Sequence, residues 1–232
     1  MISEYMETLF LIVITALSAL AAGFIPDAAY RYACYKSEKR ATPQPLYLIT
    51  NRHKLACVLV CAVFTAVSAL YEPAWKAVFA AVFVWTALFG AFVDSMIRII
   101  GNEMLAALFL AGVIYRFLCG GFQAVFTGIV AMIGILVLFV VSALILKLLS
   151  GSGGVGMGDV KLAMTAAFIA GKENMLLFLI GMSAAMVIYV GIRLYSHTLT
   201  LRSSFPMCLP LMMGLLLSVS GEVADLLSIP IP

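Results

Sequence analysis

The chain's longest apolar run passes into a glycine-rich segment that ends in a lone carboxylate: VFTGIVAMIGILVLFVVSALILKLLSGSGGVGMGDVKL, residues 125–162. An apolar run of this length is typical of a helix that crosses a membrane. A charge close to such a run is costly unless the protein uses or compensates it. The stretch therefore predicts a membrane protein and directs attention to Asp159.

The composition supports the same class. The chain has 232 residues, of which 64% are hydrophobic and 11% are charged, with a mean hydropathy of +1.14. Soluble domains carry about 25% charged residues. A soluble protein this apolar could not cover its surface, so we predict an integral membrane protein in contact with the lipid bilayer. The net charge of +3 offers no basic patch for nucleic acid.

Apolar runs of spanning length recur along the whole chain. Only the segment 26–53 is polar over a sizeable length, and we expect it to be a short basic loop. The sequence thus predicts an all-α polytopic bundle in a single membrane domain, 1–232, with a helical core at 72–221. We expect about eight transmembrane helices, at residues 5–25, 54–71, 75–94, 103–118, 122–148, 158–171, 174–193 and 205–221.

The positions of the basic residues predict the orientation. With eight spans, eleven of the fourteen Lys and Arg residues fall on one side, and only Lys76, Arg116 and Lys172 fall on the other. Loops rich in Lys and Arg stay in the cytoplasm. The first side, which holds the loop 26–53, is therefore predicted to be cytoplasmic, and both termini are predicted to lie outside.

Two acids stand at the predicted cytoplasmic ends of spans. Asp94 ends the third span, and Asp159 opens the sixth. An acid in the first turn of a helix can be a simple cap, so this alternative stays open for Asp159. Asp94 meets the unfavourable end of the helix dipole, although Arg98 lies four residues on and could pair with it. Embedded ionisable residues mark a functional site by default.

A pair of close carboxylates can hydrolyse an amide bond. Like charges cannot both ionise cheaply, so the two groups share a proton. One carboxylate then activates water and the other protonates the substrate. We therefore predict Asp94 and Asp159 as a catalytic pair. The sequence contains no metal-ligand cluster, and we predict neither a metal nor a cofactor.

The glycines before Asp159 are expected to have a structural role. Gly154, Gly156 and Gly158 allow positive φ and let another chain segment pass closely, as an extended substrate requires. The alternative is an ordinary turn between two helices.

These residues resemble the type IV prepilin peptidase family, the GxGD-type membrane aspartic proteases. The segment 154–162, GVGMGDVKL, is similar to the family's second catalytic motif, GMGxGDxKL, with Val for the first Met. The family's first motif is an Asp followed by a hydrophobic residue, Pro and Asn or Asp. Asp94 and the triplet 100–102, IGN, resemble it, with Gly101 in place of Pro.

Weaker matches cover the rest of the chain. Gly23, Phe24 and Arg31 resemble an N-terminal family segment, GSFLNVxIxR, and Ile49 and Arg52 resemble ISxRYP. FPMCLPLMMG, residues 205–214, is loosely similar to the late segment PFGPxLA. The resemblance implies a multi-pass enzyme of the bacterial cytoplasmic membrane whose active site faces the cytoplasm.

The resemblance also implies a substrate. The family removes the basic leader from prepilins or pseudopilins, cutting after a glycine that precedes an apolar helix. Lys161, Arg98 and Asn102 then become candidates to support the two acids or to contact the substrate. The alternative for Lys161 and Arg98 is that their long side chains only extend to the membrane–water interface.

One departure concerns a second activity. Many family members carry two CxxC pairs in the first cytoplasmic loop and N-methylate the product with S-adenosylmethionine. Residues 26–53 contain only Cys34, which cannot form a four-cysteine zinc site, and this counts against methylation.

Two other functions compete with the peptidase. A proton- or cation-coupled transporter also uses embedded carboxylates, but it predicts acids near the bilayer midplane on broken helices and an internal repeat. A silent scaffold for pilus assembly predicts that both acids are dispensable. The sequence leaves the oligomeric state and the particular pilin open.

Overall fold

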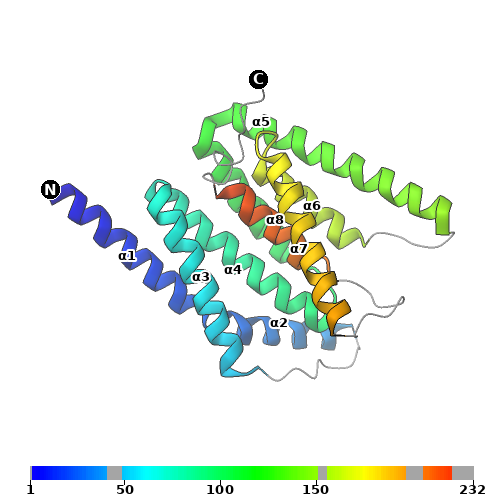
Figure 1. Ribbon diagram of the computed structural model, residues 1–232, viewed down its shortest axis with the longest axis horizontal. Helices are drawn as coiled ribbons and strands as arrows, with labels where there is room; N and C mark the ends of the chain where they lie inside the picture. Colours follow the sequence, from blue (N-terminus) through cyan, green and yellow to red (C-terminus); the bar gives the residue numbers. More distant parts are fainter. Residues whose placement is uncertain (1, 41–48, 151–155, 197–205, 221–232) are drawn as a thin grey trace. The chain divides into compact units, whose positions relative to one another are not determined.

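The protein is helical throughout the part that the structure describes. A computed structural model describes residues 2–40, 49–150, 156–196 and 206–220. Within these ranges the chain forms helices and no strands, as the hydropathy pattern predicts (Figure 1). The helices are α1 Ile2–Ala22, α2 Ile25–Lys39, α3 Asn51–Tyr71, α4 Ala74–Ile97, α5 Asn102–Ser150, α6 Met157–Ala170, α7 Met175–Tyr195 and α8 Cys208–Val219.

The chain divides into two compact units. Unit 1 is Met1–Ile99, in which α1 packs on α3, and α4 packs on α2 and α3. Unit 2 is Ile100–Pro232, in which α6 packs on α5 and α8, and α8 packs on α7. The single membrane domain that we expect from the sequence stays a prediction.

Polar side chains join three helices inside unit 1. The hydroxyl of Ser18 on α1 lies 3.2 Å from that of Thr65 on α3, and both residues are buried. The indole Nε1–H of Trp85 on α4 donates to the carbonyl of Ser18 at 3.0 Å. In an apolar surrounding, a polar group without a partner is costly. These contacts therefore favour one arrangement of α1, α3 and α4 over others.

The polar segment 26–53 is less irregular than its composition indicates. Its first part is the helix α2, with Pro26 at the start, Asp27 in the first turn and Lys36 and Lys39 in the last. These are favourable positions for a helix start and for both ends of the helix dipole. The carboxylate of Asp27 forms an ion pair with Lys54 of α3 at 2.6 Å. The expectation of a loop is thus wrong for Ile25–Lys39.

Helix α5 contains a sharp turn. Its 49 residues would extend about 73 Å at 1.5 Å per residue, more than twice the roughly 30 Å of a bilayer's hydrocarbon core. The helical geometry breaks at Gly120 and Gly121, and Gly121 has φ 60°, which favours glycine. The chain turns back there (Figure 1). The break lies between the two predicted spans 103–118 and 122–148.

The number of membrane crossings stays a prediction. Five segments of the described residues are long and apolar enough to cross: Leu9–Lys39, Asn51–Tyr71, Ala74–Ile97, Asn102–Ile145 and Met175–Tyr195. Helices α6 and α8 have only 14 and 12 residues, below the roughly 20 that a crossing needs. About eight spans are therefore not confirmed.

Helix α6 is largely enclosed within unit 2. Its residues from Leu162 to Ala170 are buried except for Met164, which is half-buried. Helix α5 approaches it closely at Gly128, where a Cβ would lie 2.7 Å from the carbonyl oxygen of Phe168. Other parts of unit 2 therefore surround α6 from Leu162 onward.

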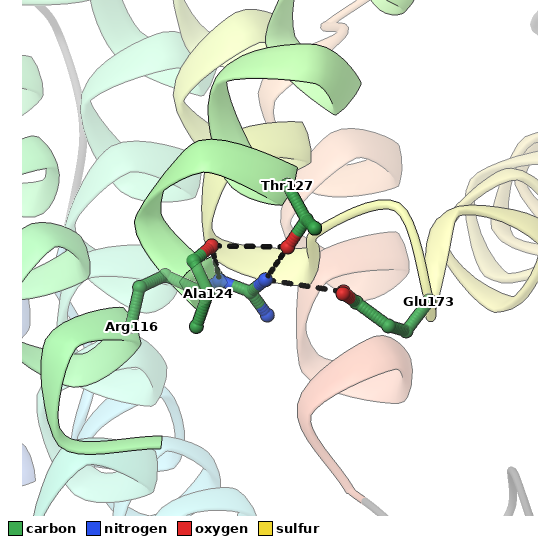
Figure 2. A network of polar contacts seen from close by, with 4 residues as sticks. All are labelled: Arg116, Ala124, Thr127 and Glu173. Atoms are coloured by element: carbon green, nitrogen blue, oxygen red, sulfur yellow. Dashed lines mark hydrogen bonds and ion pairs between the residues drawn. The ribbon is translucent and has the colours of Figure 1, made fainter. Parts of the chain in front are cut away.

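A buried arginine stabilises the C-terminal end of α6 (Figure 2). Arg116, 6% exposed, donates through Nε to the carbonyl of Ala124 at 2.9 Å and through Nη2 to the hydroxyl of Thr127. The same Nη2 lies 3.1 Å from the carboxylate of Glu173, in the connection from α6 to α7. The guanidinium covers Gly171, which ends α6 with φ 72°: a Cβ there would lie 2.5 Å from it. Arg116 thus joins both halves of α5 to the end of α6.

Candidate functional site

Asp94 lies in the last turn of α4 and is 5% exposed. The helix ends where Arg98 adopts a left-handed conformation, φ 52° and ψ 44°, and its N–H donates to the Asp94 carbonyl at 2.9 Å. A residue other than glycine costs about 1–2 kcal/mol in this conformation. The turn therefore ends the helix just after the buried acid.

The side chain of Arg98 does not form the predicted pair. It is exposed, and the described residues contain no ion pair between Arg98 and Asp94. The reason is geometric: residues four apart face each other only when both are helical, and Arg98 is left-handed. Its contact with Asp94 is the main-chain hydrogen bond alone.

Asp159 lies in the first turn of α6, which begins after Gly156. It is half-buried, and the positive end of the helix dipole favours its ionised form. The buried residues that follow in α6 hold this turn in place. The position fits both a capping role and the predicted catalytic one.

The glycines near Asp159 provide space rather than unusual dihedral angles. Gly156 has φ −59°, and neither it nor Gly158 uses the positive φ that glycine allows. A Cβ on Gly156 would lie 2.7 Å from Oδ2 of Asp159, and one on Gly158 would lie 3.3 Å from Cβ of Ile100. The absence of side chains thus lets the Asp159 carboxylate fold back over the helix start. Gly154 lies outside the described residues.

Lys161 and Asn102 contact each other beside this turn. Nζ of Lys161 donates to Oδ1 of Asn102 at 3.4 Å, a long hydrogen bond between two exposed side chains. Asn102 is the first residue of α5, so the contact joins the starts of α5 and α6. The structure therefore brings two of the predicted residues, Lys161 and Asn102, into contact, and Asp159 lies two residues before Lys161 on α6. The sequence proposes both members of the Lys161–Asn102 pair but not their contact.

An open groove of about 260 Å³ begins at this pair and runs between α5 and α6. Its walls are mostly apolar, and the sequence gives no hint of it because its residues come from three separate segments. Each wall residue reads as ordinary packing when it is taken alone. Only the packing of both halves of α5 against α6 creates the space.

Asp94 belongs to unit 1 and Asp159 to unit 2, so the pairing of their carboxylates stays a prediction. Within the described residues, no group of three or more His, Cys, Asp or Glu side chains could hold a metal ion.

Comparison with known proteins yields one finding. Residues 81–191 match the type IV leader peptidase family. The match includes Asp94, Asn102, Asp159 and Lys161, and it supports the family resemblance of the two motifs. The weaker N-terminal resemblances lie outside it. No curated protein and no solved structure matches the chain.

Proposed function

We propose, on the premise that the chain is a member of the type IV leader peptidase family, that it is a membrane aspartic endopeptidase that removes the leader from prepilin-like substrates. The observation that carries the proposal is a buried acid at the end of one helix and a second acid in the first turn of another, both within the matched residues. Each acid stands in a segment that resembles a motif of the family.

The two carboxylates divide the chemistry between them. One acid of Asp94 and Asp159 is protonated and the other ionised, because two close like charges cannot both form cheaply. The ionised carboxylate takes a proton from water, whose oxygen attacks the scissile carbonyl carbon. The protonated one donates its proton to the carbonyl oxygen, giving a tetrahedral diol. The diol then collapses: one of its hydroxyls gives its proton to the ionised carboxylate, the C–N bond breaks, and the nitrogen leaves with a proton from the other carboxyl group, which restores the starting state of the pair.

The placement of the enzyme follows from its charges. The basic residues at the predicted helix ends support a site on the cytoplasmic side, and the family resemblance supports a bacterial cytoplasmic membrane. The leader would then stay in the cytoplasm, while the apolar segment that follows it stays in the bilayer. Methylation of the product is not part of the proposal, since Cys34 is the only cysteine of segment 26–53.

Replacement of the acids tests the proposal. Asp94→Asn and Asp159→Asn keep size but cannot supply both the base and the acid, so each should lower the rate of leader removal by about a thousandfold or more. The measurement is cleavage of a prepilin in membranes, with the protein level and thermal unfolding checked for each variant.

Glu103 offers a matched control. It is an acid in the first turn of α5, as Asp159 is in the first turn of α6. Glu103→Gln removes the same dipole interaction and should leave cleavage near the wild-type rate. The proposal fails if either Asp→Asn variant still cuts normally, or if Glu103→Gln is equally inactive while remaining folded.

A further inference from the structure

The groove between α5 and α6 is bounded at both ends by side-chain contacts. At one end Lys161 contacts Asn102, and at the other the rings of Phe109 and Phe168 lie 5.0 Å apart. The second contact lies seven residues further along both helices, from 102 to 109 and from 161 to 168. The first half of α5 and α6 therefore run parallel, and the groove between these contacts is about 10 Å long.

The walls of the groove are apolar beyond its first contact. Leu105, Ala106 and Phe109 come from the first half of α5, Met132 from the second half, and Met164 from α6. The one hydroxyl in the wall, that of Thr165, donates to the carbonyl of Lys161 at 2.9 Å. The interior thus accepts apolar groups, and its Met side chains can adapt to different shapes.

The mouth of the groove offers hydrogen-bond donors. An ammonium has three N–H donors, and the described residues show one contact for Lys161, to Asn102 Oδ1. The amide nitrogen of Asn102 adds two more donors. An extended peptide that enters the groove carries carbonyl groups without secondary-structure partners, and these need donors at membrane depth. Lys161 and Asn102 meet this need.

The dimensions favour a peptide over a lipid tail. An extended chain advances about 3.3 Å per residue, so about three residues fit in 10 Å. A lipid acyl chain fills one leaflet, about half of the 30 Å hydrocarbon core, and exceeds the groove. The ammonium of Lys161 also repels a basic leader. The better occupant is the apolar stretch on the other side of the scissile bond.

We propose that this groove is the subsite for the apolar residues that follow the scissile bond, with Phe109, Met132 and Met164 contacting their side chains. Lys161 and Asn102 donate hydrogen bonds to the main-chain carbonyls of the same residues. The groove starts two residues beyond Asp159 on α6, about 3 Å along the helix axis. The inference rests on the proposed peptidase function and names the part of the substrate that the enzyme reads.

A pair of alanines allows a controlled test. Ala106 and the neighbouring Ala107 are both exposed, but only Ala106 lines the groove. Ala106→Leu fills the groove and should lower kcat/KM about tenfold for substrates with Leu or Phe as the first apolar residue after the cut. It should have little effect on a substrate with Ala at that position, and Ala107→Leu should affect none of the three. Equal effects of Ala106→Leu on all three substrates, or no effect on any, would overturn the proposal.

A binding measurement separates this proposal from the peptidase function. A photo-crosslinking phenylalanine analogue is placed at Phe109 in the Asp159→Asn variant, with the same analogue at the adjacent, exposed Leu110 as control. A radiolabelled apolar peptide should crosslink at 109, compete with unlabelled peptide, and crosslink weakly at 110. Saturable crosslinking without cleavage by the wild type would contradict the peptidase function alone. Crosslinks to phospholipid only would overturn the subsite.

Discussion

The two ends of α6 are built in opposite ways. At its start, Gly156 and Gly158 leave space around a half-buried carboxylate, and the neighbouring contact is the long, exposed hydrogen bond from Lys161 to Asn102. At its end, Gly171 is covered by a buried guanidinium that holds both halves of α5 and the connection to α7 (Figure 2). Helix α6 is therefore fixed at its end, far from Asp159, and accessible at its start, beside Asp159.

The two glycines that bound α6 should affect different properties when they are replaced. Gly156→Ala places a methyl group where the Asp159 carboxylate lies, and displacement of a catalytic group by about 1 Å costs about a hundredfold in rate. We expect this loss in the cleavage assay, with a decrease in unfolding free energy below about 1 kcal/mol.

Gly171→Ala is the matched control at the other end. It should leave the cleavage rate near wild type and instead lower stability, because residue 171 has positive φ and a Cβ would meet Arg116. If both substitutions changed the same property, the two ends would not have separate roles.

Removal of the arginine should act on stability rather than on cleavage chemistry. Arg116→Met keeps the length of the side chain but removes the buried guanidinium that donates to half-buried acceptors on Ala124 and Thr127, although the Ala124 carbonyl still accepts from the Thr127 hydroxyl. We expect unfolding free energy to fall by about 2 kcal/mol, measured by denaturant unfolding in detergent micelles.

Lys172→Met removes an exposed positive charge beside Glu173 and serves as the control. It should change stability by less than about 0.5 kcal/mol. A comparable loss in both variants would mean that charge balance, not the buried contacts of Arg116, fixes this end of α6.

The smallest expected effect is a pH dependence at the same end. Burial raises the pKa of Glu173, but a backbone hydrogen bond, the hydroxyl of Thr127 and the guanidinium of Arg116 lower it by more, so the net pKa lies below the ordinary value of 4.5. The ionised carboxylate therefore stabilises the fold above about pH 4.5, and this contribution is lost as pH falls through the lowered pKa.

Unfolding of the wild type and Glu173→Gln between pH 7 and pH 3 measures this contribution. The wild type should be slightly more stable at pH 7, and the two proteins should converge at low pH. The difference is small because the carboxylate is 55% exposed. A difference that grows as the pH falls would contradict the assignment.

Hydropathy predicts much of this fold because the transfer of a side chain into an apolar environment depends little on its neighbours. The expected runs at 54–71, 75–94 and 174–193 coincide with α3, α4 and α7, and the break after residue 118 is present at Gly120–Gly121. Helix α2 is missed because its polar composition outweighs signals that were present, namely Pro26 at its start and two lysines at its end.

The hydropathy pattern does not predict contacts between segments that are distant in the sequence. The sequence marks Arg116 only as one of three basic residues on the less basic side, although an arginine just before a Gly-Gly pair in an apolar stretch is itself unusual. Its partners, at 124, 127 and 173, follow from the turn at Gly121 and from the packing of α6. For the same reason the residues Asp159, Lys161 and Asn102 are predicted individually, while the groove beside them is not.

The short length of α6 determines how deep in the membrane Asp159 would lie. Its 14 residues extend about 21 Å. In the orientation that the basic residues predict, with the Arg116–Glu173 end at the outer interface, its first turn would stop about 10 Å short of the opposite edge of a 30 Å hydrocarbon core. In the proposed function, Asp159 would then act below the membrane surface. A substrate could be cut without lifting its apolar segment into water, and only the polar leader and one water molecule would have to travel inward.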